Sequence, residues 1–177
     1  MAIVFGRGPL SSSRYLTIDT LVATGIWAGG DRTRSGGRMI HLTDEMRDAI
    51  NNALADGTPV VVATASPDGR PDLAFKGSVL VWDPEHLAYW ERSRGETLRN
   101  LEANPHVCLL YRNPQRGLAW RFYGVAELHP DGDLRARIME RVVPVELERD
   151  PERKGVAVLI RVDRVLRGRD VIMAREE

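Results

Sequence analysis

The chain has 177 residues, of which 43% are hydrophobic and 28% are charged, values that are ordinary for a globular protein with one domain. Its formal net charge is zero, so neither nucleic acid nor an anionic membrane is an expected partner. No apolar run approaches the roughly 20 residues that span a membrane, and residues 1–10 lack the long apolar core of a signal peptide. We therefore expect a cytoplasmic protein.

Residues 1–38 differ in composition from the rest of the chain. They are rich in glycine, serine and arginine, a composition that rarely supports packing, although the apolar stretch Leu21–Trp27 could dock on the domain. We interpret residues 1–38 as an N-terminal extension or arm and residues 39–177 as the folded domain. Because Met39 stands at the apparent start of this domain, an upstream choice of start codon remains an alternative.

The first part of the domain reads as a helix followed by a hairpin. Thr43 is a good N-cap, acidic residues follow it, and apolar residues recur at helical spacing until Gly57 ends the helix. A β-branched run at 60–64, a turn at 66–69 and an apolar run at 73–81 then predict two paired strands.

The remaining pattern continues the series of strands. In chain order we expect a strand at 86–90, a short helix at 96–103, strands at 107–112 and 119–128, a helix from Asp131 to about Val142, a loop at 143–154 and a strand at 156–165. Tight turns join most of these strands, without βαβ crossovers. The sequence therefore predicts a mainly β domain with flanking helices, in which six antiparallel strands close into a barrel.

Several common catalytic and metal-binding patterns are missing from the sequence. The four histidines (His41, His86, His106 and His129) are scattered, mostly at element ends, and no zinc spacing, catalytic triad, GxGxxG motif or P-loop lysine motif is present. The single cysteine, Cys108, lies in an apolar run that predicts a buried core thiol. We predict no metal site.

Two segments are candidates for binding chemistry. Lys76-Gly77-Ser78 interrupts a strand with a glycine, which often marks either close approach of a ligand or a bulge. Residues 91–100 form a basic, hydroxyl-bearing loop that enters a helix, and Arg94 and Thr97 are placed to hold a phosphate there. The alternatives are a bulged strand with a solvated lysine and a capped surface loop. Both segments flank the strand at 86–90, so a hairpin could bring them together.

A third segment, Trp120-Arg121-Phe122-Tyr123, offers aromatic rings and a cation for stacking on a planar heterocycle. Because strand residues alternate, Trp120 and Phe122 share one face, and Arg121 and Tyr123 share the other. The alternative is that one of these pairs belongs to the core.

The residues from about Leu42 to Val165 resemble the pyridoxamine 5′-phosphate oxidase-like, FMN-binding split-barrel family. The resemblance is carried by residues 61–71, Lys76-Gly77-Ser78, residues 97–107 with their NL-x-x-NP pattern, and residues 123–127. It implies a split β-barrel that forms a homodimer, with FMN in a groove between the subunits. On one subunit it implies contacts from Lys76, Gly77, Ser78, Arg94, Thr97 and Asn100, and on the other from Trp120 and Arg121.

The sequence departs from the family pattern at the phosphate loop. Many members carry a lysine at the position that aligns with Thr97, so Arg94 would have to replace it. The chain also lacks the residues that bind the substrate phosphate in true pyridoxamine phosphate oxidases, and we therefore do not predict vitamin B6 synthesis.

The resemblance leads us to expect an FMN-dependent oxidoreductase with an unidentified small-molecule substrate. One alternative is a reductase that uses the deazaflavin F420 as a diffusible cosubstrate. A second is a non-enzymatic protein that binds flavin or haem, and a third is a structural dimer whose site has decayed.

Overall fold

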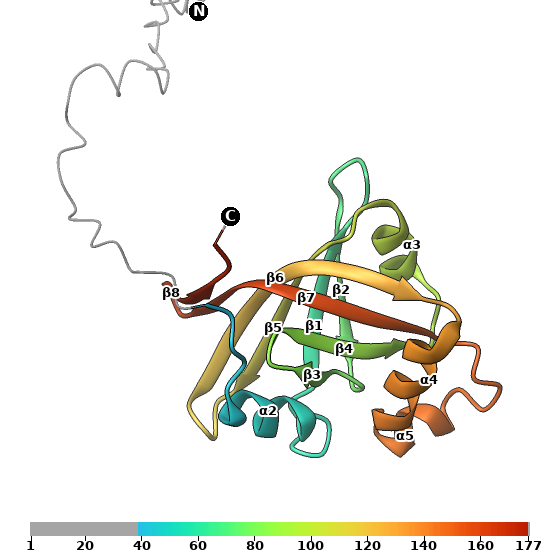
Figure 1. Cartoon of the computed structure of the whole chain (residues 1–177), viewed down its shortest axis with the longest axis horizontal. Coiled ribbons are helices and arrows are strands. Elements are labelled where there is room, and N and C mark those ends of the chain that lie inside the picture. The colour runs from blue at the N-terminus through green and yellow to red at the C-terminus, as the bar shows by residue number, and fades with distance from the viewer. Residues whose placement is uncertain (1–38, 177) are drawn as a thin grey trace, which may run out of the picture. The chain divides into compact units, whose positions relative to one another are not determined.

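The computed structural model of the chain describes residues 39–176. The predicted N-terminal arm at 1–38 lies outside the described residues. The elements in chain order are α2 (Asp44–Asn51), β1 (Val60–Ala65), β2 (Pro71–Lys76), β3 (Leu80–Asp83), β4 (His86–Glu91), α3 (Glu96–Ala103), β5 (His106–Asn113), β6 (Leu118–His129), α4 (Gly132–Arg141), α5 (Pro144–Glu148), β7 (Val156–Arg167) and β8 (Asp170–Ala174) (Figure 1).

All the strands belong to one antiparallel sheet, and this confirms the predicted mainly β fold with flanking helices. The sheet has eight strands, with hydrogen-bonded neighbours in the order β2-β1-β5-β6-β7-β4-β3 and with β8 paired to β7. The two ends of this path, β2 and β3, are consecutive in the chain, so the sheet curls round on itself (Figure 1). In the part of the chain that the structure describes, β2 and β3 are not paired with each other, and the barrel is split there.

The predicted number of six strands is wrong for two physical reasons. The apolar run at 73–81 divides at Gly77 and Ser78, because its first half pairs with β1 and its second half pairs with β4. A short strand, β8, follows β7 after a turn at Gly168, whose φ of 61° is in the left-handed region. The predicted loop at 143–154 also contains α5, which begins with a proline, a residue that suits the first helical position.

The first helix begins where it was predicted but ends at Asn51, before Gly57, and the turn of the first hairpin forms at the predicted residues. The Thr43 side chain accepts a hydrogen bond from the Met46 backbone N–H at 3.2 Å and caps α2. At the hairpin tip the Gly69 N–H donates to the Ser66 carbonyl at 2.8 Å. Gly69 adopts a φ of 83°, a conformation that a residue with a side chain rarely takes.

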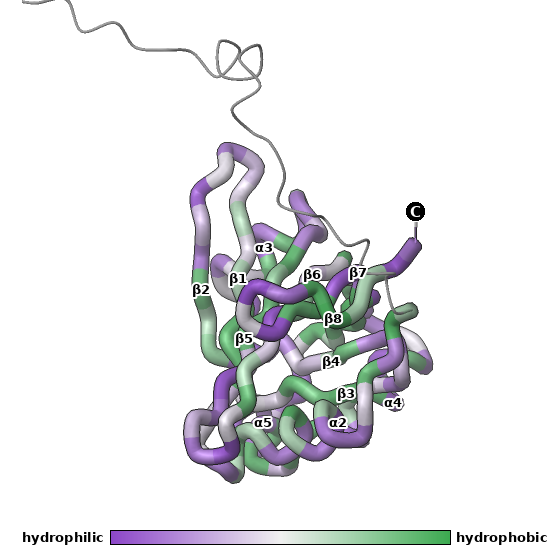
Figure 2. Tube along the Cα trace, turned by 90° about the vertical axis from the view of Figure 1, so that its left-hand side faces the viewer, coloured by the Kyte–Doolittle hydropathy of each residue, from purple (hydrophilic) through white to green (hydrophobic). Residues whose placement is uncertain are grey.

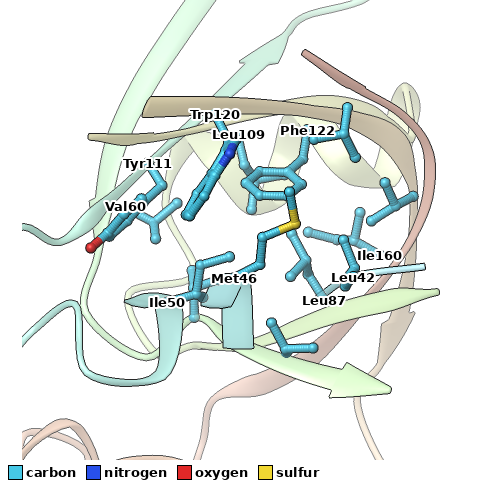
Figure 3. Close-up of a cluster of buried hydrophobic side chains, with 14 of the residues drawn as sticks. Leu42, Met46, Ile50, Val60, Leu87, Leu109, Tyr111, Trp120, Phe122 and Ile160 are labelled. Atoms are coloured by element: carbon cyan, nitrogen blue, oxygen red, sulfur yellow. The ribbon is translucent and has the colours of Figure 1, made fainter. Parts of the chain in front are cut away.

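The barrel interior is filled by alternate residues of the strands and closed at one end by α2. Figure 3 shows Met46 and Ile50 of α2 pointing toward Phe122 and the other core side chains. Strand alternation turns Val107 and Leu109 inward, and Cys108 therefore lies half-buried on the outer face of β5. The prediction of a buried core thiol is wrong for this reason.

A second apolar cluster lies between the sheet and α4. Trp90 of β4 packs there beside Ile138 of α4, and α5 contributes the partly buried Leu147. The Trp90 indole N–H donates to the Asp150 carboxylate at 2.8 Å, which ties the segment after α5 to β4. No helix within residues 39–176 has the length and apolar character needed to cross a membrane.

Candidate functional site

The segment Lys76-Gly77-Ser78 lies where the chain leaves β2 and turns toward β3. The Lys76 ammonium forms a buried ion pair with the carboxylate of Glu91, at the end of β4. The Ser78 hydroxyl donates to the Trp90 carbonyl at 3.1 Å and accepts from the Trp90 N–H at 3.0 Å. Lys76 and Ser78, which lie between β2 and β3, therefore contact the end of β4 with their polar side chains.

A pocket of about 380 Å³ opens at this point. It lies between the end of β2, the end of β4, the start of α3 and α5. Its lining includes the apolar Leu54, Pro59, Ala74, Phe75 and Trp90 and the polar or charged Lys76, Ser78, Glu91, Arg92, Ser93, Thr97, Glu146 and Arg149, with Gly77 between them. The predicted residues Lys76, Gly77, Ser78 and Thr97 are thus brought together in one pocket.

Several hydroxyl and ammonium donors of this pocket are engaged by carboxylates. The Ser93 hydroxyl donates to Glu91 at 2.6 Å, so Glu91 holds both Lys76 and Ser93. The Thr97 hydroxyl donates to Asp72 of β2 at 3.2 Å. These contacts fix the donors in place, but a bound anion would have to share them with the carboxylates.

Glu146 of α5 is a second buried carboxylate in the pocket, with 5% of its surface exposed. It accepts a hydrogen bond from Arg92 Nε at 3.2 Å and one from Arg149 Nη1 at 2.8 Å. A Cβ on residue 77 would lie 2.8 Å from Glu146 Oε1, so a larger residue at this position would push the carboxylate out of its place. The group that lies close to Gly77 in this structure is therefore the Glu146 carboxylate of the protein itself.

Sequence reasoning did not select Arg92, Glu146 or Arg149. Arg92 belongs to the same basic loop as Arg94, and the charge of that loop is the signal that could have indicated it. Glu146 and Arg149 lie in the segment predicted as a loop, where one charged residue among many carries no signal until α5 places them against β4.

The other predicted residues lie outside this pocket. Arg94 is exposed, has a φ of 48°, and is absent from the pocket lining. Asn100 is buried in α3, where its amide donates to the Thr64 hydroxyl at 3.1 Å, and it borders a separate hollow of about 280 Å³ beside Ser66 and Arg70.

The aromatic segment of β6 divides between two faces, as its alternation predicts. Trp120 has 2% of its surface exposed and stacks on Tyr111 in the barrel core, at a centroid distance of 5.6 Å, so its ring faces no surface site (Figure 3). Arg121 lies on the outer face, where it donates to the Gly168 carbonyl at 2.7 Å. The core thus takes one pair and leaves Arg121 and Tyr123 outside.

The charges of the pocket fit an anionic group such as a phosphate. The cations Lys76, Arg92 and Arg149 outnumber the carboxylates Glu91 and Glu146. The N-terminus of α3 adds backbone N–H groups beside Thr97, and no side chain within residues 39–176 caps it. None of the four histidines lines this pocket. Within the described residues, no three His, Cys, Asp or Glu side chains gather as they would around a metal ion.

The sequence profile of pyridoxamine 5′-phosphate oxidase matches residues 42–166, which span nearly all of the barrel. The chain belongs to the pyridoxamine 5′-phosphate oxidase family. The matched range includes every residue of the pocket described above.

The chain is also similar to individual proteins outside this profile comparison. An uncharacterized protein of Methanocaldococcus jannaschii is 30% identical over 126 residues, which are 70% of this chain and 79% of that protein. The crystal structure of HupZ from Group A Streptococcus matches with a TM-score of 0.59 and 27% identity, over 75% of this chain and 98% of that chain.

A related structure from Nostoc punctiforme, named as a pyridoxamine 5′-phosphate oxidase-related, FMN-binding protein, matches with a TM-score of 0.56. It covers 68% of this chain and 78% of that chain. Its 13% identity shows a common fold and nothing finer.

Proposed function

We propose that this chain binds FMN at the pocket between β2, β4, α3 and α5 and acts as a flavin-dependent oxidoreductase on a small-molecule substrate. The observation that carries the proposal is the gathering of three cations, Lys76, Arg92 and Arg149, and the α3 N-terminus around one cavity with excess positive charge. A phosphate group fits this donor set. When bound, a flavin supplies hydride transfer at its N5 atom, and the protein supplies position and electrostatics.

The apolar face of the sheet next to the pocket supports a homodimer. Leu73 and Phe75 of β2 are 69% and 76% exposed, and Leu110 of β5 is 40% exposed. In the sheet register Val61 of β1 pairs with both Phe75 and Leu110, so these side chains form one continuous apolar face. Figure 2 shows β2 at the margin of the molecule, with hydrophobic residues along part of its length. Such an exposed face is typical of a protein interface, and a second copy of the chain is the proposed occupant.

Phe75 connects this apolar face to the cofactor pocket. It lines the pocket, and it also lines a neighbouring hollow of about 410 Å³ that Val61, Leu110 and Arg112 border. A second copy placed over the face would therefore lie next to the bound cofactor. Dimerisation and cofactor affinity are linked in this proposal, because each would stabilise the other.

The proposal is tested by titrating FMN into the purified protein while flavin absorbance and fluorescence are followed, with size-exclusion chromatography alongside. We expect saturable binding by a species with the mass of a dimer. A dimer that does not bind FMN would contradict the proposal. In that case a titration with F420 or with haem, which is recognised by its Soret band, would identify the alternative cofactor.

A further inference from the structure

The donors first expected to hold the phosphate are partly occupied by protein carboxylates. Lys76 and Ser93 both contact Glu91, and Thr97 contacts Asp72. Each of these carboxylates would lie beside a phosphate bound to the same donors, and like charges that close repel each other. Lys76 is only 9% exposed, so the main phosphate ligands are expected among cations of the pocket that keep unused donors and are also open to solvent.

Arg92 and Arg149 meet this condition. A guanidinium group carries five N–H donors. Arg92 uses Nε to reach Glu146, and Arg149 uses Nη1. Across residues 39–176, neither side chain makes another hydrogen bond, so both Nη groups of Arg92 and the Nε and Nη2 groups of Arg149 are unused by the protein. Both side chains line the pocket, and each is about half exposed, which leaves them open to a ligand.

Glu146 contacts both arginines and orients them. Its side chain is 7% exposed, and its two oxygens contact different arginines, Oε2 on Arg92 and Oε1 on Arg149. One buried carboxylate thus brings together two cations that would otherwise repel each other. Gly77 leaves room for the Glu146 carboxylate, and α5 carries Glu146 to this place.

We infer that Arg92 and Arg149, oriented by Glu146, are the main residues that bind the phosphate of the flavin, and that Arg94 does not bind it. The inference rests on the proposed function. Arginine is suited to this role because its planar fork of donors matches two oxygens of a phosphate. Arg94 lies outside the pocket lining, although it is in the same loop as Arg92.

The test compares FMN with riboflavin, which lacks only the phosphate, as probes of each variant. Arg92→Ala and Arg149→Ala are expected to weaken FMN binding by roughly tenfold or more, the effect of losing a charge-assisted hydrogen bond. Riboflavin affinity is expected to stay within about twofold to threefold of that of the unaltered protein. Arg94→Ala is the matched control and is expected to leave both affinities unchanged.

Two roles for Glu146, positioning the arginines or repelling the phosphate, predict opposite changes in the FMN affinity of Glu146→Ala. If Glu146 only repelled the phosphate, Glu146→Ala would bind FMN more tightly. If Glu146 positions the arginines, the same variant binds FMN several-fold more weakly and keeps its riboflavin affinity. The thermal melting temperature of each ligand-free variant shows whether it is folded.

The outcomes separate this inference from the proposed function. Failure of the unaltered protein to bind either FMN or riboflavin contradicts the proposed function. If the unaltered protein binds FMN but the Arg92 and Arg149 variants lose both ligands equally, or if Arg94→Ala loses the preference for FMN, the assignment of the phosphate ligands is overturned while the proposed function stands.

Discussion

Single buried polar residues connect the pocket to the rest of the fold. Trp90 faces the second apolar cluster, but its backbone is bound by Ser78 and its indole N–H by Asp150. The Asp150 carboxylate also accepts hydrogen bonds from the backbone N–H groups of Lys154 and Gly155, at 3.0 and 2.8 Å. This residue therefore fixes the segment between α5 and β7 against the strand that borders the pocket.

Asp150 is expected to contribute to stability through its charge. Burial acts to raise the pKa of its carboxyl, but the hydrogen bonds from Gly155, Trp90 and Lys154 outweigh burial and hold the pKa below its usual value. We expect Asp150→Asn to lower the free energy of unfolding by about 1.5–3 kcal/mol at pH 7, because an amide cannot accept all three bonds. Urea denaturation measures this difference.

The pH dependence provides the control for that prediction. Because the pKa of Asp150 is lower in the folded protein than in the unfolded chain, its stabilising effect is complete above the unfolded pKa of about 4 and is lost as pH falls through the folded pKa. The stability difference between Asp150→Asn and the unaltered protein should therefore be constant from pH 7 to 5 and shrink below about pH 4. A difference that stays constant down to pH 3 would argue against a charged acceptor.

At this scale the sequence predicted residue types better than side-chain directions. The alternation in β6 showed that Trp120 and Phe122 share a face, but which face is the core depends on the curvature of the whole sheet. The basic loop was correctly located, yet it is Arg92 that enters the pocket while Arg94 stays outside its lining. In the pocket Arg92 contacts Glu146, which is 54 positions away in the sequence, so no local pattern indicates this contact.

At the scale of elements, prediction succeeded where the signals are local. The range of α3 was predicted at 96–103 and is confirmed, because glycine before it and Asn104-Pro105 after it limit the helix. The division between β2 and β3 was missed because both halves are apolar and only their different partners separate them. Those partners are set by the closing of the barrel, which a local pattern does not contain.

The capping of α2 gives a prediction for an element. The Thr43 side chain satisfies the Met46 N–H, and α2 closes one end of the barrel core. Thr43→Ala is expected to lower the free energy of unfolding by about 1 kcal/mol, a typical value for loss of an N-cap. Chemical denaturation measures the change. Thr43→Ser keeps the hydroxyl and should retain most of the stability, and an equal loss in both variants would mean that the threonine methyl group, not the cap, matters.

For the whole molecule, the apolar face of β1, β2 and β5 is the feature that a single chain leaves unexplained. Replacing Leu110, which is 40% exposed, by aspartate would place a charge within the proposed contact. We expect Leu110→Asp to be a monomer by light scattering and to bind FMN at least tenfold more weakly, since the cofactor lies next to the contact. Val171 of β8 is also 40% exposed, so Val171→Asp is a matched control that should remain a dimer with unchanged affinity. A monomeric unaltered protein, or a Leu110→Asp variant that stays dimeric, would show that this face is not where two copies meet.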